Sequence, residues 1–159
     1  MPALASTPSG VDAAEFAAAC AVIRNHCGWH IAPSVTETLT LDGTGGTILR
    51  LPSMHVTEVD TVTNDGADVT TPSWSKNGVI EHYYWTSARR GVEVTLTHGY
   101  TSCPDEVLAL AKAMAMTGAT SRALGVKSQT AGPFSVEYEG TFADAVTSIL
   151  APYRVPPSP

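Results

Sequence analysis

The sequence predicts an α+β fold: an N-terminal helix, a small antiparallel β-sheet insert, a long helix, a loop with a short strand, and a short C-terminal helix with an extended tail. Two observations carry this prediction. Apolar residues recur at helical spacing before residue 28 and after residue 104, but alternate between about 35 and 100. Turn residues cut the alternating part into short runs, which is typical of antiparallel strands and not of strand–helix–strand units.

The first helix is expected to follow a mobile arm of ten small and polar residues, MPALASTPSG (1–10). Ser9 and Asp12 are both candidate N-caps, because their side-chain oxygens can accept free backbone N–H groups. Gly28 is the expected stop, since glycine is favoured just past a helix end. The residues near the predicted buried face are Val11, Phe16, Ala19, Cys20 and Ile23.

Residues 35–100 are expected to form about six short strands. The turn signal DGTGG (42–46) predicts a hairpin between the first two of them. Asn64-Asp65-Gly66 closes the third run, and a turn at Arg89-Arg90-Gly91 precedes the last. The runs are SVTETLTLD (34–42), TILRLP (47–52), HVTEVDTVTN (55–64), a short run around Trp74, VIEHYYW (79–85) and VEVTLTHGY (92–100).

The second helix is predicted to begin at Pro104, because proline suits the first turn and the acids that follow it favour the positive helix end. It should run about five turns, with Val107, Leu110/Ala111, Met114 and Thr117/Gly118 on one stripe. The alanines at 109, 113 and 119 would allow close approach of a neighbouring helix. A loop and short strand (126–140), a short amphipathic helix (141–153) and the extended tail YRVPPSP complete the chain. We expect an arm (1–10), one domain (11–151) and a Pro-rich tail (152–159).

Composition limits the classes of function. The 159 residues suffice for one buried core, and only 15% are charged, against a typical ~25%. A net charge of −6 argues against nonspecific binding to nucleic-acid backbones, yet it is compatible with a channel through which DNA slides. No apolar run approaches the ~18 residues that cross a membrane, and no signal peptide is evident, so we expect synthesis in the cytoplasm and three free thiols.

The densest group of metal-ligand side chains lies around RNHCGWHIAP (24–33) and comprises Cys20, His26, Cys27 and His30. Zinc sites that are recognisable from sequence need a second pair of ligands at short spacing. Only His98 and Cys103 are near candidates, and they do not form such a pair. We therefore expect buried or helix-end residues here, and no metal or cofactor.

Catalytic signatures are also weak. Cys103 precedes a helix start, where a thiol pKa can be lowered, but no base accompanies it, and neither a G-x-S-x-G elbow nor a phosphate loop is found. We expect no catalytic residue, with a zinc- or thiol-dependent enzyme as the weakest alternative. A second alternative is a small ligand- or carbohydrate-binding β-module that uses Trp74 and the run Tyr83-Tyr84-Trp85. As a strand, this run would place Tyr84 on one face and its two neighbours on the other.

Four ordered stretches of the sequence carry a resemblance to a known family. They are CGWHIAPSVTETLTLDGTGGTILRLPSMHVTEVDTVTNDG, VEVTLTHGYTSCPDEVLALAKAMA, GPFSVEYEGTF and ILAPYRVPPSP. Taken in this order over about residues 11–157, they resemble the head-to-tail connector proteins of long-tailed bacteriophages, the small adaptor or head-completion proteins.

The resemblance implies a structural protein of the virion neck and no enzymatic activity. Such adaptors form a ring, typically of twelve copies, below the portal protein. The ring extends the DNA channel without sequence-specific DNA binding and provides a platform for the next connector (a stopper) or a tail protein. By the same resemblance, the residues expected to contact the portal or a neighbouring copy are Gly132, Pro133, Phe134, Tyr153, Arg154, Val155 and Pro156.

Overall fold

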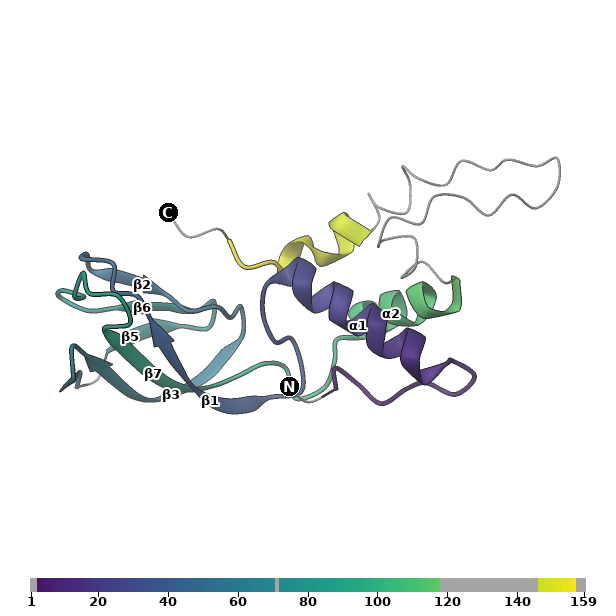
Figure 1. The fold of residues 1–159 in the computed structure, drawn as a ribbon, viewed down its shortest axis with the longest axis horizontal. Coiled ribbons are helices and arrows are strands. Elements are labelled where there is room, and N and C mark those ends of the chain that lie inside the picture. The colour runs from purple at the N-terminus through teal and green to yellow at the C-terminus, as the bar shows by residue number, and fades with distance from the viewer. Residues whose placement is uncertain (1–2, 71, 118–145, 157–159) are drawn as a thin grey trace. The chain divides into compact units, whose positions relative to one another are not determined.

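The structure is a computed structural model that describes residues 3–70, 72–117 and 146–156 (Figure 1). Its contacts divide the chain into two compact units, which are described separately. The helical unit comprises Met1–Cys27 and Cys103–Arg154, and the β unit comprises Gly28–Ser102 and Val155–Pro159. The expected division into arm, domain and tail remains a prediction.

Helix α1 (Ala13–Cys27) opens the helical unit. The Asp12 carboxylate accepts the N–H groups of Ala14 and Glu15 at 2.9 and 3.0 Å, so Asp12 and not Ser9 is the N-cap. Gly28 has φ +80°, the left-handed conformation that ends a helix, which confirms its predicted role. The buried residues of α1 are Phe16, Ala19, Cys20, Ile23 and Cys27.

Helix α2 (Asp105–Thr117) packs against α1. It begins where predicted, and the Leu108 N–H donates to the Pro104 carbonyl at 2.9 Å. Thr117, expected at the end of the buried stripe, is exposed, and Gly118 lies outside the described residues. The buried residues of α2 are Val107, Leu110, Ala111, Met114 and Ala115. Leu4, from the predicted arm, is also buried.

The C-terminal part of the helical unit is described from residue 146. Residues 146–150 are helical and continue into the 3₁₀ turn η1 (Ala151–Tyr153). The predicted loop and short strand (126–140) lie outside the described residues. Within the described parts of the chain, no helix has both the length and the apolar character to cross a membrane.

The β unit contains two antiparallel sheets among its described residues. The four-stranded sheet has the order β1-β7-β3-β4, and the three-stranded sheet has the order β2-β6-β5 (Figure 1). The strands are β1 (Val35–Leu41), β2 (Ile48–Arg50), β3 (Val56–Asn64), β4 (Ala67–Asp68), β5 (Ser73–Ser75), β6 (Val79–Glu81) and β7 (Val92–His98).

The hairpin predicted between residues 34–42 and 47–52 is wrong. β1 pairs with β7, from Val35 opposite His98 to Leu41 opposite Val92, while β2 pairs with β6 in the other sheet. Within DGTGG, Gly43 serves a close backbone approach and not a tight turn, because a Cβ there would lie 1.9 Å from the Thr86 carbonyl oxygen. Gly43 and Gly45 donate their N–H groups to the carbonyls of Ala88 and Thr86 at 2.9 and 3.0 Å, so the chain crosses from one sheet to the other.

The strand predicted over residues 79–85 is shorter than expected. β6 ends at Glu81, so the alternation assigned to the three aromatic residues that follow is wrong: Tyr83 and Tyr84 are both exposed, at 83% and 49%. Trp85 is fully buried. Its backbone N–H donates to Gly46 at 2.7 Å and its indole N–H to the Thr47 carbonyl at 3.1 Å, which ties it to the segment before β2.

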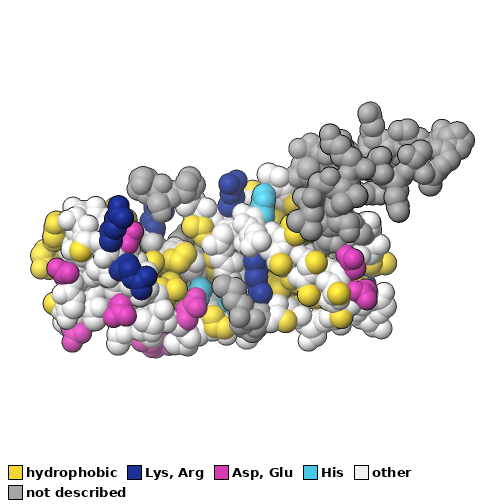
Figure 2. Space-filling view, in the orientation of Figure 1, with side chains coloured by type: hydrophobic (Ala, Val, Ile, Leu, Met, Phe, Trp, Pro, Cys, Tyr) yellow, Lys and Arg dark blue, Asp and Glu magenta, His cyan; other side chains and the backbone are white. Residues whose placement is uncertain are grey.

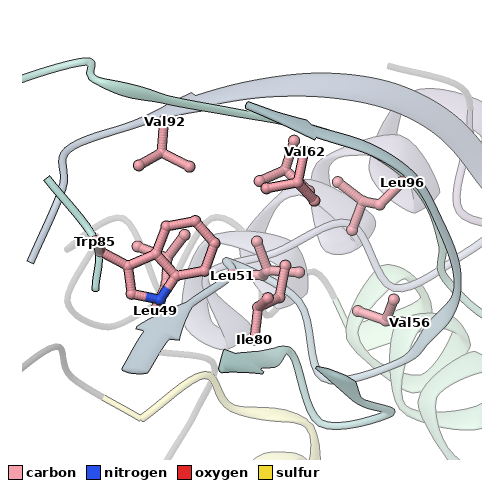
Figure 3. Close-up of a cluster of buried hydrophobic side chains, with 9 residues drawn as sticks. Leu49, Leu51, Val56, Val62, Ile80, Trp85, Val92 and Leu96 are labelled. Carbon is pink, nitrogen blue, oxygen red and sulfur yellow. The ribbon is translucent and has the colours of Figure 1, made fainter. Parts of the chain in front are cut away.

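The core of the β unit lies between its two sheets. Figure 3 shows side chains from β7 and β3 and from the region of β2 and β6 pointing toward one another, with the Trp85 indole among them. Every second residue of β7 is buried, as the alternating sequence predicts. The members of this cluster are Leu49, Leu51, Val56, Val62, Ile80, Trp85, Val92, Val94 and Leu96.

Candidate functional site

The start of the C-terminal tail is anchored within the helical unit. Pro152 lies in the first turn of η1, and Arg154 is extended at φ −85° and ψ 128°, so the helix ends at Tyr153. The Tyr153 hydroxyl donates to the Glu106 carboxylate in the first turn of α2, and the Tyr153 side chain is buried. Tyr153 therefore fixes the point from which the tail leaves.

The residues after this anchor are more accessible. Arg154 and Pro156 are exposed, and Val155 is half-buried. The Val155 Cβ lies 3.9 Å from the position that a Cβ would occupy on Gly28, within the β unit. The other expected contact residues, Gly132, Pro133 and Phe134, lie outside the described residues.

The group of cysteines and histidines does not form a metal site in the structure. Cys20 and Cys27 are buried on α1, and all three cysteines are free, as predicted. His30 is buried in the β unit, with its Nε2 2.5 Å from the Pro33 carbonyl. Among the described residues, no three His, Cys, Asp or Glu side chains are placed to hold an ion.

The pKa values of all three thiols are raised, which disfavours the reactive thiolate form. Burial raises the pKa of the Cys27 thiol to about 11. Burial, with a smaller contribution from the neighbouring Cys20, also raises the pKa of Cys103 to about 11, and burial raises that of Cys20. The position of Cys103 before a helix start, where a thiol pKa can be lowered, does not give a lowered pKa here, because burial disfavours the thiolate. All three thiols are therefore protonated at neutral pH.

A pair formed by a buried histidine and a partly exposed glutamate links β1 and β7. His98 is only 1% exposed, and its Nε2 lies 2.9 Å from the Glu37 carboxylate. The His98 ring also lies 6.5 Å from the Trp29 ring and 6.0 Å from the His30 ring, measured between centroids. The sequence analysis missed this pair, since the strands were not known to be neighbours. The hydrogen bond between Glu37 and His98 favours the observed register of β1 against β7.

The exposed aromatic residues do not share one strand face. Trp74 lies on the edge strand β5 opposite the buried Ile80, and is 38% exposed. Tyr83 and Tyr84 follow the end of β6. The centroids of the Tyr83 and His82 rings lie 4.2 Å apart. A flat stacking platform for a sugar or base needs aromatic faces held side by side. This arrangement does not favour the β-module alternative.

The outer face of α1 is almost free of charge. Figure 2 shows hydrophobic side chains gathered on the helical unit over this helix. Ala109 and Ala113 of α2, which were expected to allow close approach of a neighbouring helix, are exposed as well, while Ala119 lies outside the described residues. The exposed small residues of α1 are Ala13, Ala14, Ala17, Ala18 and Ala21.

Comparison with known proteins gives a family match and several similar folds. Residues 6–155 match the model of a family described as head completion protein. No curated protein matches the chain. A chain from the neck of a native gene transfer agent particle, computed with C12 symmetry, is 18% identical with a TM-score of 0.58, over 94% of this chain and 86% of that one.

Two further structures are similar. A chain from the neck of an empty gene transfer agent particle, computed with C6 symmetry, is 17% identical with a TM-score of 0.50, covering 92% of this chain and 78% of that one. A chain from the virion of the native particle is 18% identical with a TM-score of 0.51, covering 92% and 77%. At these identities the likeness shows the fold.

Proposed function

The chain belongs to the family of head completion proteins, and from this membership we propose that it is a ring-forming structural adaptor between head and tail of a phage-like particle. The family match carries the proposal because it spans residues 6–155, which include both units. It also confirms the resemblance that the ordered sequence stretches predicted. A structural family supports a non-enzymatic role, and the raised thiol pKa values agree with it.

A ring of identical copies is the proposed assembly. The similar folds come from particle necks computed with C12 and C6 symmetry, which supports rotational symmetry, and twelve copies is the proposed number. A closed ring uses one surface against a different surface of the next copy. The uncharged alanine face of α1 suits such a contact, because small side chains let another element approach closely.

The proposed location is the neck of the virion, after synthesis in the host cytoplasm. The portal protein lies on one side of the ring, and a further connector or tail protein lies on the other. Arg154, Val155 and Pro156 are the proposed portal contacts, and Gly132–Phe134 is a second segment that contacts the portal or a neighbouring copy. Tyr153 has a different task in this proposal: it holds the base of the tail through Glu106. DNA passes through the ring, and the net charge of −6 disfavours tight binding to its phosphates.

The test is truncation of the chain after Tyr153, which removes the tail but keeps its anchor. The truncated protein should retain the thermal midpoint of the full chain and lose at least about tenfold in affinity for isolated portal rings. Biolayer interferometry measures the affinity, and negative-stain imaging shows whether rings stack on portals. The matched control is Ser75→Ala, an exposed change on β5 far from the tail in sequence, which should leave docking unchanged. Full affinity of the truncated chain would contradict the assignment of the tail.

The assembly step has its own test. We expect the free protein to be monomeric or weakly associated and to form rings on the portal, because extended segments gain contacts only when a partner is present. Mass photometry of the purified protein, alone and with portal, measures this. A stable closed ring without portal would contradict this order of assembly.

A further inference from the structure

The four-stranded sheet ends on a long strand whose outer side is open. β1 has seven residues, whereas β4, β2 and β5, which end the sheets elsewhere, have two, three and three. Among the described residues, no strand pairs with β1 on the side away from β7. A strand edge of this length presents a row of unpaired backbone groups that can accept another strand.

The hydrogen bonds of β7 identify which residues of β1 face the open side. The Gly99 N–H donates to His55, before β3, and the Tyr100 N–H donates to Ile31, before β1, both at 2.8 Å. The Thr97 carbonyl likewise accepts from a side chain of β3, the Thr57 hydroxyl, at 3.0 Å.

The N–H and C=O groups of successive residues point to alternate sides of a strand. Since Thr97 and Gly99 face β3, the groups that face β1 belong to His98, Leu96, Val94 and Val92. The residues of β1 opposite these four are Val35, Glu37, Leu39 and Leu41. The residues between them, Thr36, Thr38 and Thr40, therefore direct their N–H and C=O groups to the open side.

The edge of β1 lacks the usual protections against pairing. The strand contains no lysine and no proline, and its pairing with β7 runs without a bulge. Its one charged residue, Glu37, is hydrogen-bonded to His98. The hydroxyls of Thr36 and Thr38 bond to Thr97 and Thr95 of β7, at 2.7 and 2.9 Å. These hydroxyl contacts join β1 to β7 and leave the outer backbone groups of β1 without a strand partner among the described residues.

The two faces of β1 also differ in polarity, so they would favour different side chains on an added strand. Leu39 and Leu41 are only partly buried, although they pack against the core cluster of the β unit. The threonines on the other face are uncharged and largely exposed. A strand added at this edge would cover the two leucines if it placed apolar residues on their side and polar residues on the side of the threonines.

We propose that residues 134–140 of a neighbouring copy add to the edge of β1 as a further antiparallel strand. This inference rests on the proposed function, since it needs a second copy in the ring. The segment reads FSVEYEG, with Phe134, Val136 and Tyr138 alternating with polar residues, and this alternation matches the two faces of β1. It belongs to residues 118–145, and the six residues from Gly140 to the described residue 146 span at most roughly 20 Å at about 3.3 Å per extended residue. The segment can therefore extend by about this length toward a neighbouring copy.

The main test is disulfide cross-linking between two differently marked chains assembled together on portal rings. One chain carries Thr38→Cys, and the other carries one added cysteine at 135, 137 or 139. These positions lie on the polar face of the segment, which is the face that Thr38 shares, and three are needed because the register along β1 is open. A cross-linked dimer that forms only in the mixture must join two copies. We expect at least one register to give about tenfold more dimer than the matched control, Ser75→Cys on the edge strand β5.

The outcomes separate the inference from the proposed function. Rings that form without a cross-link in any register would overturn the strand addition and leave the adaptor role standing. A cross-link that forms only within one chain carrying both cysteines would overturn it too, since the segment would then cover its own β1. Failure to form any ring on the portal would remove the adaptor role and the strand addition together.

A backbone variant provides an independent test. In Thr38→Pro the lost N–H faces the open side, so pairing with β7 is kept, while an incoming strand loses a donor and meets the proline ring. Thr38→Ala removes the same hydroxyl and keeps the N–H. Both variants should unfold within a few degrees of each other, and ring formation should fall at least about tenfold in the proline variant only. Equal ring formation by both would overturn the inference.

Discussion

The two units of the molecule bury different kinds of side chain. The β unit fills its core with bulky residues from two sheets, among them Trp85 and Ile80. The helical unit also buries large residues, but half of the buried positions on α1 and α2 are alanines or cysteines, and the contact between Tyr153 and Glu106 holds its C-terminal end. Large interlocking side chains make a unit sensitive to any loss of volume, whereas helices packed through small residues depend more on their end contacts. The β unit is therefore expected to be the more rigid body of the two.

The largest effect is expected from Trp85→Ala. It removes a fully buried indole and its hydrogen bond to Thr47, so it should cost about 3–5 kcal/mol of unfolding free energy. Amide hydrogen exchange should accelerate along β7 and much less along α2, because the two units have separate cores. The matched control is Trp74→Ala at the exposed edge, which should cost less than about 1 kcal/mol. Equal acceleration in both units would contradict the separation.

A smaller loss is expected from Gly43→Ala. A Cβ at this position would lie 1.9 Å from the Thr86 carbonyl oxygen, so the crossing between the sheets must open. Overpacking of this kind costs about 1–3 kcal/mol, measurable by urea unfolding. Gly46→Ala is the control, because the nearest atom to its Cβ is 3.9 Å away and its φ is not left-handed. If both alanine variants were equally stable, the close approach would not matter.

In the helical unit, Tyr153→Phe should have a modest effect. It removes the hydroxyl that donates to Glu106 and keeps the buried ring, so about 0.5–1.5 kcal/mol should be lost. The tail should also be cut faster by a protease just beyond residue 153, since its base is less firmly held. Thermal unfolding and limited proteolysis measure the two effects. Unchanged proteolysis would show that the ring alone anchors the tail.

Near neutral pH the smallest effect is expected from the buried thiols, because their effect on stability appears only in alkaline solution. In the unfolded chain Cys103 loses its proton near its ordinary pKa of 9.0, whereas in the folded protein it does so near 11. Below pH 9 both states are protonated and the thiol has no effect on stability. Between pH 9 and 11 the unfolded state binds fewer protons, so stability falls as pH rises.

Cys103→Ser tests this effect, because serine does not ionise in this range. Its unfolding free energy, measured at several pH values from 8 to 11, should fall less steeply than that of the unchanged protein. Val35→Thr, a change in the β unit that introduces no ionisable group, should keep the original slope. Identical slopes for the serine variant and the unchanged protein would mean that burial does not hold the Cys103 proton.

Local signals in the sequence determined the elements of the fold. Asp12 and Gly28 mark the ends of α1, Pro104 marks the start of α2, and the alternation from Val92 to His98 gives a strand with one buried face. Ordered motifs spread over the chain also sufficed to identify the family. The signals for the helix ends and for the strand each depend on a residue and its near neighbours, through capping, ring constraint or periodic burial, so the sequence pattern alone expresses them.

Only the tertiary structure decided which of these elements meet. The turn-like glycines of DGTGG carry the chain to residues 86–88, and β1 pairs with β7 although Glu37 and His98 lie 61 residues apart. The same contacts bury Tyr153, raise the pKa of Cys103 and leave the outer side of β1 open. These properties depend on strand pairing and on desolvation by residues that are distant in the sequence. A local sequence pattern therefore cannot predict them.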